Sequence, residues 1–251
     1  RFNLNYTGAE GNMAIALSYM GIPSELITKL PNNDIGRCAK RMLTKFEVET
    51  RHIAWGGERL GVYYLERGAS KVIYDRKHSS IAEADPSDFD WDEIFQNAGW
   101  FHFTGITAAL SENTRKICEQ ACIAAKNHGV KVSCDLNYRK NLWTSQEAQR
   151  VMKPLMNYVD VCIANEEDSE KVLGIRASNT DITAGKLSLE GYSRLAEKLA
   201  KTYGFEKVAI TLRESLSASV NNWSALLYAG GKIYVSKKYT MQIVDRVGGG
   251  D

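Results

Sequence analysis

Short apolar runs alternate with longer amphipathic stretches along this chain of 251 residues. In residues 111–128 and 189–203 the apolar positions recur every three to four residues, which predicts helices that end at Gly129 and Gly204. Strands separated by helices indicate βαβ units, and therefore an α/β fold with a mostly parallel sheet covered on both faces. The predicted strands are short, rich in apolar residues and bounded by polar ones: residues 99–106, 130–137, 159–165 and 207–212.

A second pattern interrupts this rhythm near the N-terminus. Residues 1–6 and 58–65 alternate apolar and polar positions, and the β-rich segment 71–76 follows a turn that contains Gly68. This is a hairpin signal, and it predicts a small β-layer that serves as a lid, an oligomer contact or both. The predicted domains are an α/β domain of residues 7–57 and 77–251 and a β-lid of residues 1–6 and 58–76. The α/β pattern also leads us to expect a strand before Thr7 and a helix after Asp251.

Composition narrows the class of protein. The formal net charge is +2, with 44% hydrophobic and 25% charged residues, which is typical of a globular protein without a nucleic-acid surface. No apolar run approaches the roughly 20 residues of a membrane span, and the first residues lack the apolar core of a signal peptide. The five cysteines form no CxxC pair, and their odd number favours reduced thiols in a cytoplasmic protein.

The stretch "TGAEGNMAIALSYMG" is the first candidate for ligand binding. Gly8 and Gly11 flank a turn, and Asn12 is predicted to start an alanine-rich helix. Small residues there would let a ligand approach backbone N–H groups. Taken alone, these residues favour a simple glycine-capped helix start without any ligand, and neither a Walker A loop nor a dinucleotide motif is present.

Polar side chains follow the predicted strands 130–137 and 159–165. Asp135, Asn137 and Arg139 are two residues apart, so an extended backbone would direct all three to one face, where Arg139 suits a carboxylate or phosphate. A surface strand end with a salt bridge is the alternative.

The segment "ANEEDSEKVLG" opens a helix with several acids. Its acids either complement the helix dipole or, with Asn165, allow Glu167 and Asp168 to hold a hydrated Mg²⁺. Both interpretations stay open on these residues alone.

Three further groups could bind an anionic molecule. Thr211, Arg213 and Ser215 follow a strand and could contact phosphates, although surface loops are often serine-rich. Tyr63, Tyr74 and Arg76 in the β-layer could face a polar ligand or pack as ordinary cross-strand neighbours. The terminal "VDRVGGGD" combines successive glycine N–H groups, which can form an anion hole, with an acid that could act as a base: Gly248, Gly249, Gly250 and Asp251.

Taken together and in their order along the chain, these candidate motifs resemble those of the ribokinase-like (PfkB) carbohydrate kinases, and the resemblance covers essentially the whole chain. The most specific parts are the helix opening at Gly8–Gly21 and the terminal "DRVGGGD". The resemblance implies a ribokinase-like three-layer sandwich with a β-sheet lid, Asp251 as the catalytic base, and the preceding glycines as the anion hole. Two positions depart from the family pattern: Arg246 replaces Thr or Pro, and Gly249 replaces Ala while keeping the backbone donor.

Within the family, the chain is most similar to 2-keto-3-deoxygluconate (KDG) kinases. The motifs are "TGAEGN", "GVYY", "VIYDRKHSS", "TGITAALS" and "DLNYRKNLW". Fructokinases share a version of the last motif, so a neutral-sugar kinase of the same fold is an alternative, as is an inactive fragment. The resemblance implies that the sugar acid is bound by residues of these motifs: Gly8, Asn12, Tyr63, Tyr74, Arg76, Ile106, Asn137 and Arg139.

The resemblance also implies ATP and Mg²⁺ as partners of the reaction. ATP would contact Asn165, Thr211, Arg213, Ser215, Gly248 and Gly250, and Mg²⁺ would lie near Glu167 and Asp168, mainly through water. The product would be 2-keto-3-deoxy-6-phosphogluconate. We further expect a cytoplasmic enzyme that binds no nucleic acid or membrane and forms a homo-oligomer through the β-lid.

Overall fold

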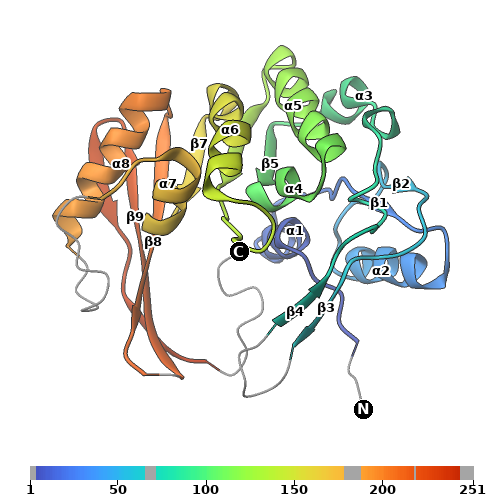
Figure 1. Cartoon of the computed structure of the whole chain (residues 1–251), viewed down its shortest axis with the longest axis horizontal. Helices are drawn as coiled ribbons and strands as arrows, with labels where there is room; N and C mark the ends of the chain where they lie inside the picture. The colour runs from blue at the N-terminus through green and yellow to red at the C-terminus, as the bar shows by residue number, and fades with distance from the viewer. Residues whose placement is uncertain (1–3, 66–71, 178–187, 218, 244–251) are drawn as a thin grey trace. The chain divides into compact units, whose positions relative to one another are not determined.

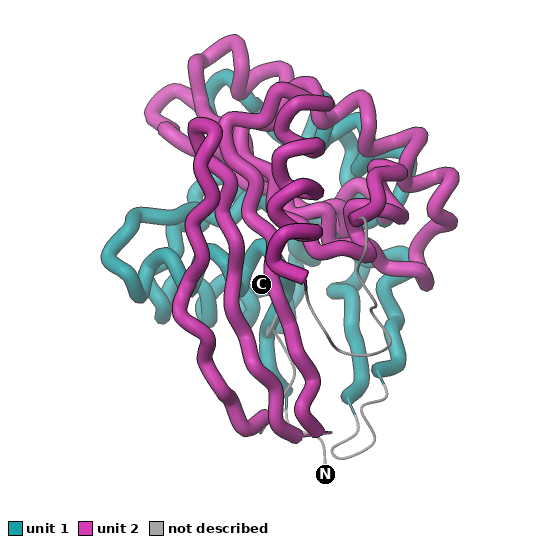
Figure 2. Tube along the Cα trace, turned by 90° about the vertical axis from the view of Figure 1, so that its left-hand side faces the viewer, with its two compact units in different colours: residues 1–94, 110–120, 246–251 teal, residues 95–109, 121–245 magenta. Residues whose placement is uncertain are grey.

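The computed structural model describes residues 4–65, 72–177, 188–217 and 219–243. The described residues form two compact units, one within 4–94 and 110–120 and the other within 95–109 and 121–243 (Figure 2). The catalytic segment predicted at Gly248–Asp251 lies outside the described residues.

The larger unit contains a sheet of seven strands (Figure 1). The strand order is β10-β9-β8-β7-β6-β5, with β11 also paired to β9. The pairings from β5 to β8 are parallel, and those that β9 makes with β8, β10 and β11 are antiparallel. The strands are β5 (Trp100–Thr104), β6 (Lys131–Asp135), β7 (Val161–Ala164), β8 (Lys207–Ser215), β9 (Val220–Ala229), β10 (Lys232–Val235) and β11 (Tyr239–Gln242).

Helices connect the parallel strands. Helix α8 packs on β8 and β9, where Val208, Ile210 and Leu226 are fully buried together with its Leu195 and Leu199. Strands β8, β9 and β11 extend well beyond the end of α8 (Figures 1 and 2). Helices α3 to α5 contribute residues to both units. The helical segments are α3 (Trp91–Phe95), α4 (Gly105–Leu110), α5 (Glu112–Asn127), α6 (Ser145–Leu155), η2 (Met156–Tyr158), α7 (Glu166–Leu173) and α8 (Leu189–Tyr203).

The smaller unit has its own core and a separate hairpin. Its core gathers Ala14, Leu30, Ala39, Leu43, Val48 and Ile53. Strands β3 and β4 pair in an antiparallel hairpin, and the short strands β1 and β2 pair in parallel. The elements are α1 (Ala9–Tyr19), β1 (Lys29–Leu30), α2 (Asp34–Lys45), β2 (Ala54–Trp55), β3 (Val62–Leu65), β4 (Val72–Asp75) and η1 (Pro86–Asp88).

Most predicted elements are confirmed. All four predicted strands are present, as are the two predicted helices and the hairpin. The predicted parallel sheet is confirmed for β5 to β8, whereas its other half is antiparallel and the sheet is mixed. Residues 4–8 form no strand, and the first helix begins at Ala9 rather than at Asn12. None of the helices described is both long and apolar enough to cross a membrane.

Candidate active site

The turn after β6 carries two of the predicted substrate residues. Strand β6 ends at Asp135, whose Oδ1 accepts a hydrogen bond of 3.1 Å from the Asn137 N–H. Asn137 is buried and has φ of +38°, a left-handed conformation that asparagine tolerates better than most residues. The expected extended backbone from Asp135 to Arg139 is therefore wrong, because the chain turns sharply at Asn137. The exposed Arg139 donates to the Tyr138 carbonyl at 3.0 Å through Nη1.

Asp168 joins this turn to the start of α7. Its Oδ1 accepts a hydrogen bond of 3.0 Å from the Tyr138 N–H, while its own N–H donates to the capping Asn165 Oδ1 at 2.8 Å. Burial raises the pKa of the Asp168 carboxyl from 3.8 to about 6, although the Tyr138 N–H and the charge of Arg139 oppose this shift. Asp168 thus holds the turn after β6 and the turn after β7 in a fixed relation.

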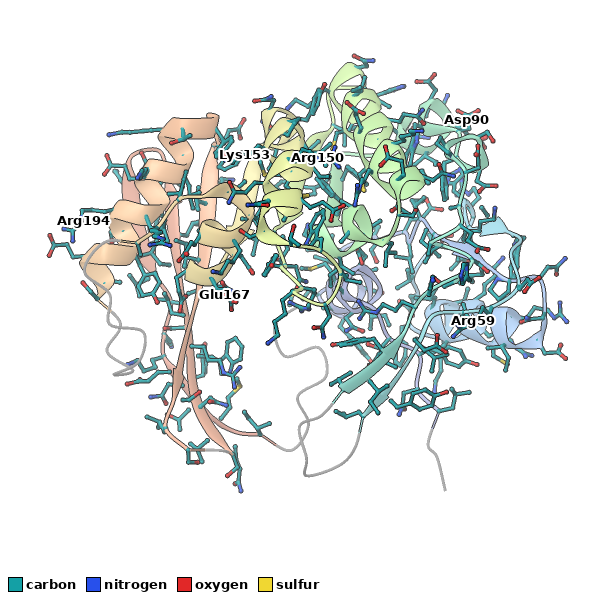
Figure 3. All side chains as sticks on the ribbon, in the orientation of Figure 1. Arg59, Asp90, Arg150, Lys153, Glu167 and Arg194 are labelled. Atoms are coloured by element: carbon teal, nitrogen blue, oxygen red, sulfur yellow. The ribbon has the colours of Figure 1, made fainter. Side chains whose placement is uncertain are left out.

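The acids of α7 differ in what they can offer to a metal ion. Glu167 is exposed at the N-terminal end of α7 (Figure 3), whereas Asp168 is 6% exposed and already uses Oδ1. Among the described residues, no group of three or more His, Cys, Asp or Glu side chains is arranged to hold a metal. Glu167 and Asp168 are therefore suited only to a hydrated Mg²⁺ that keeps most of its waters, because such an ion needs only one or two carboxylates.

The predicted nucleotide residues on β8 share one face. The strand continues through Ser215, so Thr211, Arg213 and Ser215 lie in a strand rather than in the expected loop. Their spacing of two residues places them on the same side of the sheet. The Arg213 guanidinium lies 5.5 Å from the ring centre of Trp223, its register partner on β9.

The aromatic residues of the hairpin in the smaller unit pack against each other across the two strands. Tyr63 and Tyr74 are register partners with ring centres 6.0 Å apart, and the Arg76 guanidinium lies 4.2 Å from the centre of the Tyr74 ring. The three side chains therefore gather on one face of the hairpin.

The opening of α1 is fixed by Asn12. Its Oδ1 accepts a hydrogen bond from the Thr7 hydroxyl at 2.9 Å and one from the Gly8 N–H at 3.5 Å. A Cβ at Gly8 would meet nothing within 4 Å, which leaves its backbone open to a neighbouring molecule.

Ile106 lies in the first turn of α4, directly after β5. Its N–H donates to Thr104 Oγ1 at 3.3 Å, which fixes the path from strand to helix. The preceding Gly105 was not singled out by the sequence analysis, although a Cβ there would lie 2.2 Å from the Leu136 carbonyl oxygen. A glycine directly after a strand of an α/β sheet is the signal that could have identified it.

The described residues of the predicted site are divided between the two compact units. Gly8, Asn12, Tyr63, Tyr74 and Arg76 belong to the smaller unit. Those of the larger unit follow β5, β6 and β7 or lie on β8: Ile106, Asn137, Arg139, Asn165, Glu167, Asp168, Thr211, Arg213 and Ser215. A sheet with polar side chains after three adjacent parallel strands is typical of α/β proteins that bind small molecules at the carboxyl ends of their strands.

Comparison with known proteins identifies the family. The model of the pfkB family carbohydrate kinases matches residues 1–251, and the chain belongs to this family. The crystal structure of 2-dehydro-3-deoxygluconokinase from Thermotoga maritima is 51% identical, with a TM-score of 0.94 over 99% of this chain and 76% of that one. The fold is therefore ribokinase-like.

Two curated relatives carry related names. The 2-dehydro-3-deoxygalactonokinase of Haloferax volcanii is 33% identical over 250 residues, which are 97% of this chain and 71% of that protein. The 2-dehydro-3-deoxygluconokinase of Thermoproteus tenax is 31% identical over 183 residues, which are 70% of this chain and 55% of that protein. The chain thus spans between about half and three quarters of the length of these relatives.

Proposed function

We propose that the protein is a KDG kinase, which transfers the γ-phosphoryl group of ATP to the primary hydroxyl of KDG. The products are ADP and 2-keto-3-deoxy-6-phosphogluconate. The observation that carries this proposal is the 51% identity, over 99% of the chain, to the Thermotoga maritima 2-dehydro-3-deoxygluconokinase, an equivalent name for a KDG kinase.

The substrate class is supported by the cationic residues. Arg139 after β6 and Arg76 beside Tyr74 supply two guanidinium groups, and a guanidinium binds a carboxylate through paired hydrogen bonds. A neutral sugar has no group that needs them. The proposal assigns Arg139 to the KDG carboxylate, and Tyr63, Tyr74 and Arg76 to contacts with the sugar acid.

In the proposed reaction, Asp251 accepts the proton of the primary hydroxyl as its oxygen attacks the γ-phosphorus. The bond from the γ-phosphorus to the oxygen that bridges it to the β-phosphate breaks, and ADP leaves with that electron pair. The N–H groups of Gly248, Gly249 and Gly250 stabilise the charge on the transferred group. Thr211, Arg213 and Ser215 contact the nucleotide, a role supported by their common face on β8.

Mg²⁺ would neutralise charge on the nucleotide phosphates, near Glu167, Asp168 and the capping Asn165. A ribokinase-like neighbour from E. coli was solved with ATP and Mg²⁺, and at 18% identity it shares the fold with a TM-score of 0.77. The exposed Glu167 and the engaged Asp168 favour water-mediated binding.

We also propose a cytoplasmic location and self-association through the lid. All five cysteines are free thiols, which supports a reducing compartment. The hairpin face opposite Tyr63 and Tyr74 exposes Tyr64 and Ile73, and this apolar pair supports contact with a second copy.

The decisive experiment is a coupled ADP-release assay of the full-length protein with KDG, 2-keto-3-deoxygalactonate, fructose and ribose. Both sugar acids belong in the panel because the relatives are named for both epimers. We expect phosphorylation of sugar acids and not of neutral sugars. Asp251→Asn should lower kcat on KDG by about 100-fold or more.

Substitution of Arg139 tests the carboxylate contact. Arg139→Gln should lower kcat/KM for KDG by about 10- to 100-fold, because a charge-assisted hydrogen bond is lost. Arg150→Gln on the exposed surface of α6 is the matched control and should keep wild-type kinetics (Figure 3). A kcat/KM for KDG in Arg139→Gln that equals that of the Arg150→Gln control would refute the carboxylate role.

A further inference from the structure

Two neighbouring asparagines on β9 differ in their hydrogen bonding. Asn222 uses its whole amide: Nδ2 donates to Glu214 Oε2 at 2.8 Å, and Oδ1 accepts from the Thr240 hydroxyl at 2.7 Å. Asn221 is 0% exposed, and neither its Oδ1 nor its Nδ2 has a hydrogen-bond partner among the residues described.

Strand geometry shows which face Asn221 occupies. In the antiparallel register, Asn221 pairs with Ser215 of β8 and with Met241 of β11, while Trp223 pairs with Arg213. Register partners share a face, so Asn221 lies on the face of Thr211, Arg213, Ser215 and Trp223. Asn222 and Glu214 lie on the opposite face, the one that α8 covers further along the strands.

A buried amide without partners destabilises the folded protein, because its hydrogen bonds to water are lost and not replaced. Such groups are rare in native structures and each calls for an explanation, and a bound molecule that completes the hydrogen bonds is one that fits a position beside candidate ligand-binding residues. Asn221 lies directly beside Ser215, one of the residues predicted to contact the nucleotide.

We propose that the Asn221 amide recognises the adenine base of ATP, a step that rests on the proposed kinase function. The amide has both a donor and an acceptor, and adenine offers the matching pair, an exocyclic N6 donor next to a ring-nitrogen acceptor. A phosphate offers acceptors only and would leave Oδ1 unpaired. The Trp223 ring, held by Arg213 at 5.5 Å, provides a flat surface beside the base.

The test uses Asn221→Leu, which keeps the approximate size of the side chain and removes both polar atoms. Calorimetry on the full-length protein measures the Kd of ATP and of purine riboside triphosphate, which lacks the N6 amine. Wild type should prefer ATP by about tenfold, since one hydrogen bond is lost with the analogue. In Asn221→Leu the Kd for ATP should rise by about tenfold, and the two nucleotides should bind alike.

Thermal unfolding without nucleotide separates a binding role from a structural one. Asn221→Leu should unfold at the same or a higher temperature than wild type, because an unpaired polar group is removed. Asn222→Leu is the matched control: it should unfold at a lower temperature, because two hydrogen bonds break, and keep the wild-type ratio of nucleotide affinities. If Asn221→Leu does not fold, Asn221→Ala replaces it.

An unchanged preference for ATP in a folded Asn221 variant would overturn the inference while leaving the kinase function intact. Failure of the wild-type protein to phosphorylate any sugar acid would instead overturn the proposed function. The two failures are therefore distinguished by the wild-type assay.

Discussion

At the scale of single residues, the environment of Asp168 has consequences for pH. Its pKa is about 6 in the folded protein and 3.8 without the fold. Between these values the folded state binds more protons than the unfolded state, so this group lowers the free energy of unfolding as pH rises from about 4 to about 6. At neutral pH the protein therefore carries a buried carboxylate whose charge destabilises the fold.

Asp168→Asn should increase stability at pH 7. The amide oxygen can still accept from the Tyr138 N–H, and no charge is buried, so the free energy of unfolding should rise by about 1–3 kcal/mol. Urea denaturation at several pH values in the presence of a chelator measures this change. The gain should shrink toward pH 4; a gain that is independent of pH would contradict the assigned cause.

The types of the site residues could be predicted from sequence, but their geometry could not. The positions of Asp135, Asn137 and Arg139 after an apolar strand correctly indicated the carboxyl edge of the sheet. The prediction that they share one face was wrong, because the backbone turns at Asn137. Next to this turn, the Tyr138 N–H donates a hydrogen bond to Asp168, 30 positions away. Local periodicity carries no information about such a distant partner.

At the scale of elements, Gly105 lets α4 start close to the end of β6. A Cβ at this position would lie 2.2 Å from the Leu136 carbonyl oxygen, which is backbone and cannot move aside cheaply. Leu136 directly precedes Asn137, so the close approach also positions the turn that carries Asn137 and Arg139.

Gly105→Ala should lower the free energy of unfolding by about 1–3 kcal/mol, the usual cost of forcing an extra methyl group into a packed site. The variant should also raise the KM for KDG, since the Asn137 turn is displaced. Gly99→Ala is the control, because a Cβ there meets nothing within 4 Å. Equal stability of the two variants in urea denaturation would refute the packing argument.

Elements with strong periodicity were the predictable ones. The helix predicted at residues 189–203 has the observed bounds, and its Leu195 and Leu199 are buried. The antiparallel strands β9 and β10 were missed, although the pair Gly230-Gly231 between apolar runs is a hairpin signal that the sequence contains. The continuation of β8 to Ser215 has no such signal, because it depends on pairing with β9.

At the scale of the whole molecule, the β3–β4 hairpin has two faces of different chemistry. One carries Tyr63 and Tyr74 next to Arg76, which suits a polar ligand. The other exposes Tyr64 and Ile73, which are 48% and 55% accessible. A self-associating lid would bury this second face and leave the first one to the substrate.

Ile73→Lys should therefore dissociate an oligomer formed through the lid, because two lysines would meet at the contact. Size-exclusion chromatography with light scattering should show a smaller species than wild type at the same concentration. Ile233→Lys on β10, also an exposed isoleucine, should leave the mass unchanged. An Ile73→Lys variant with the wild-type oligomeric mass would place the contact elsewhere.

The α/β class follows from the alternation of strands and helices, which is a property of the whole chain. The division into two compact units could not be predicted in the same way, since it depends on contacts between distant segments. The role of Asp251 rests on the resemblance of "DRVGGGD" to the family pattern and stays a prediction.

The buried thiols make the protein suitable for spectroscopic study. Cys118, Cys122, Cys134 and Cys162 are buried, and burial raises the pKa of the Cys162 thiol, so these groups should react slowly with maleimides. A reporter cysteine engineered on the lid and another on α8 could then be labelled with a donor and an acceptor dye. Energy transfer between them would report the distance between these two labels without removal of the four buried thiols, once the half-buried Cys38 is replaced by serine.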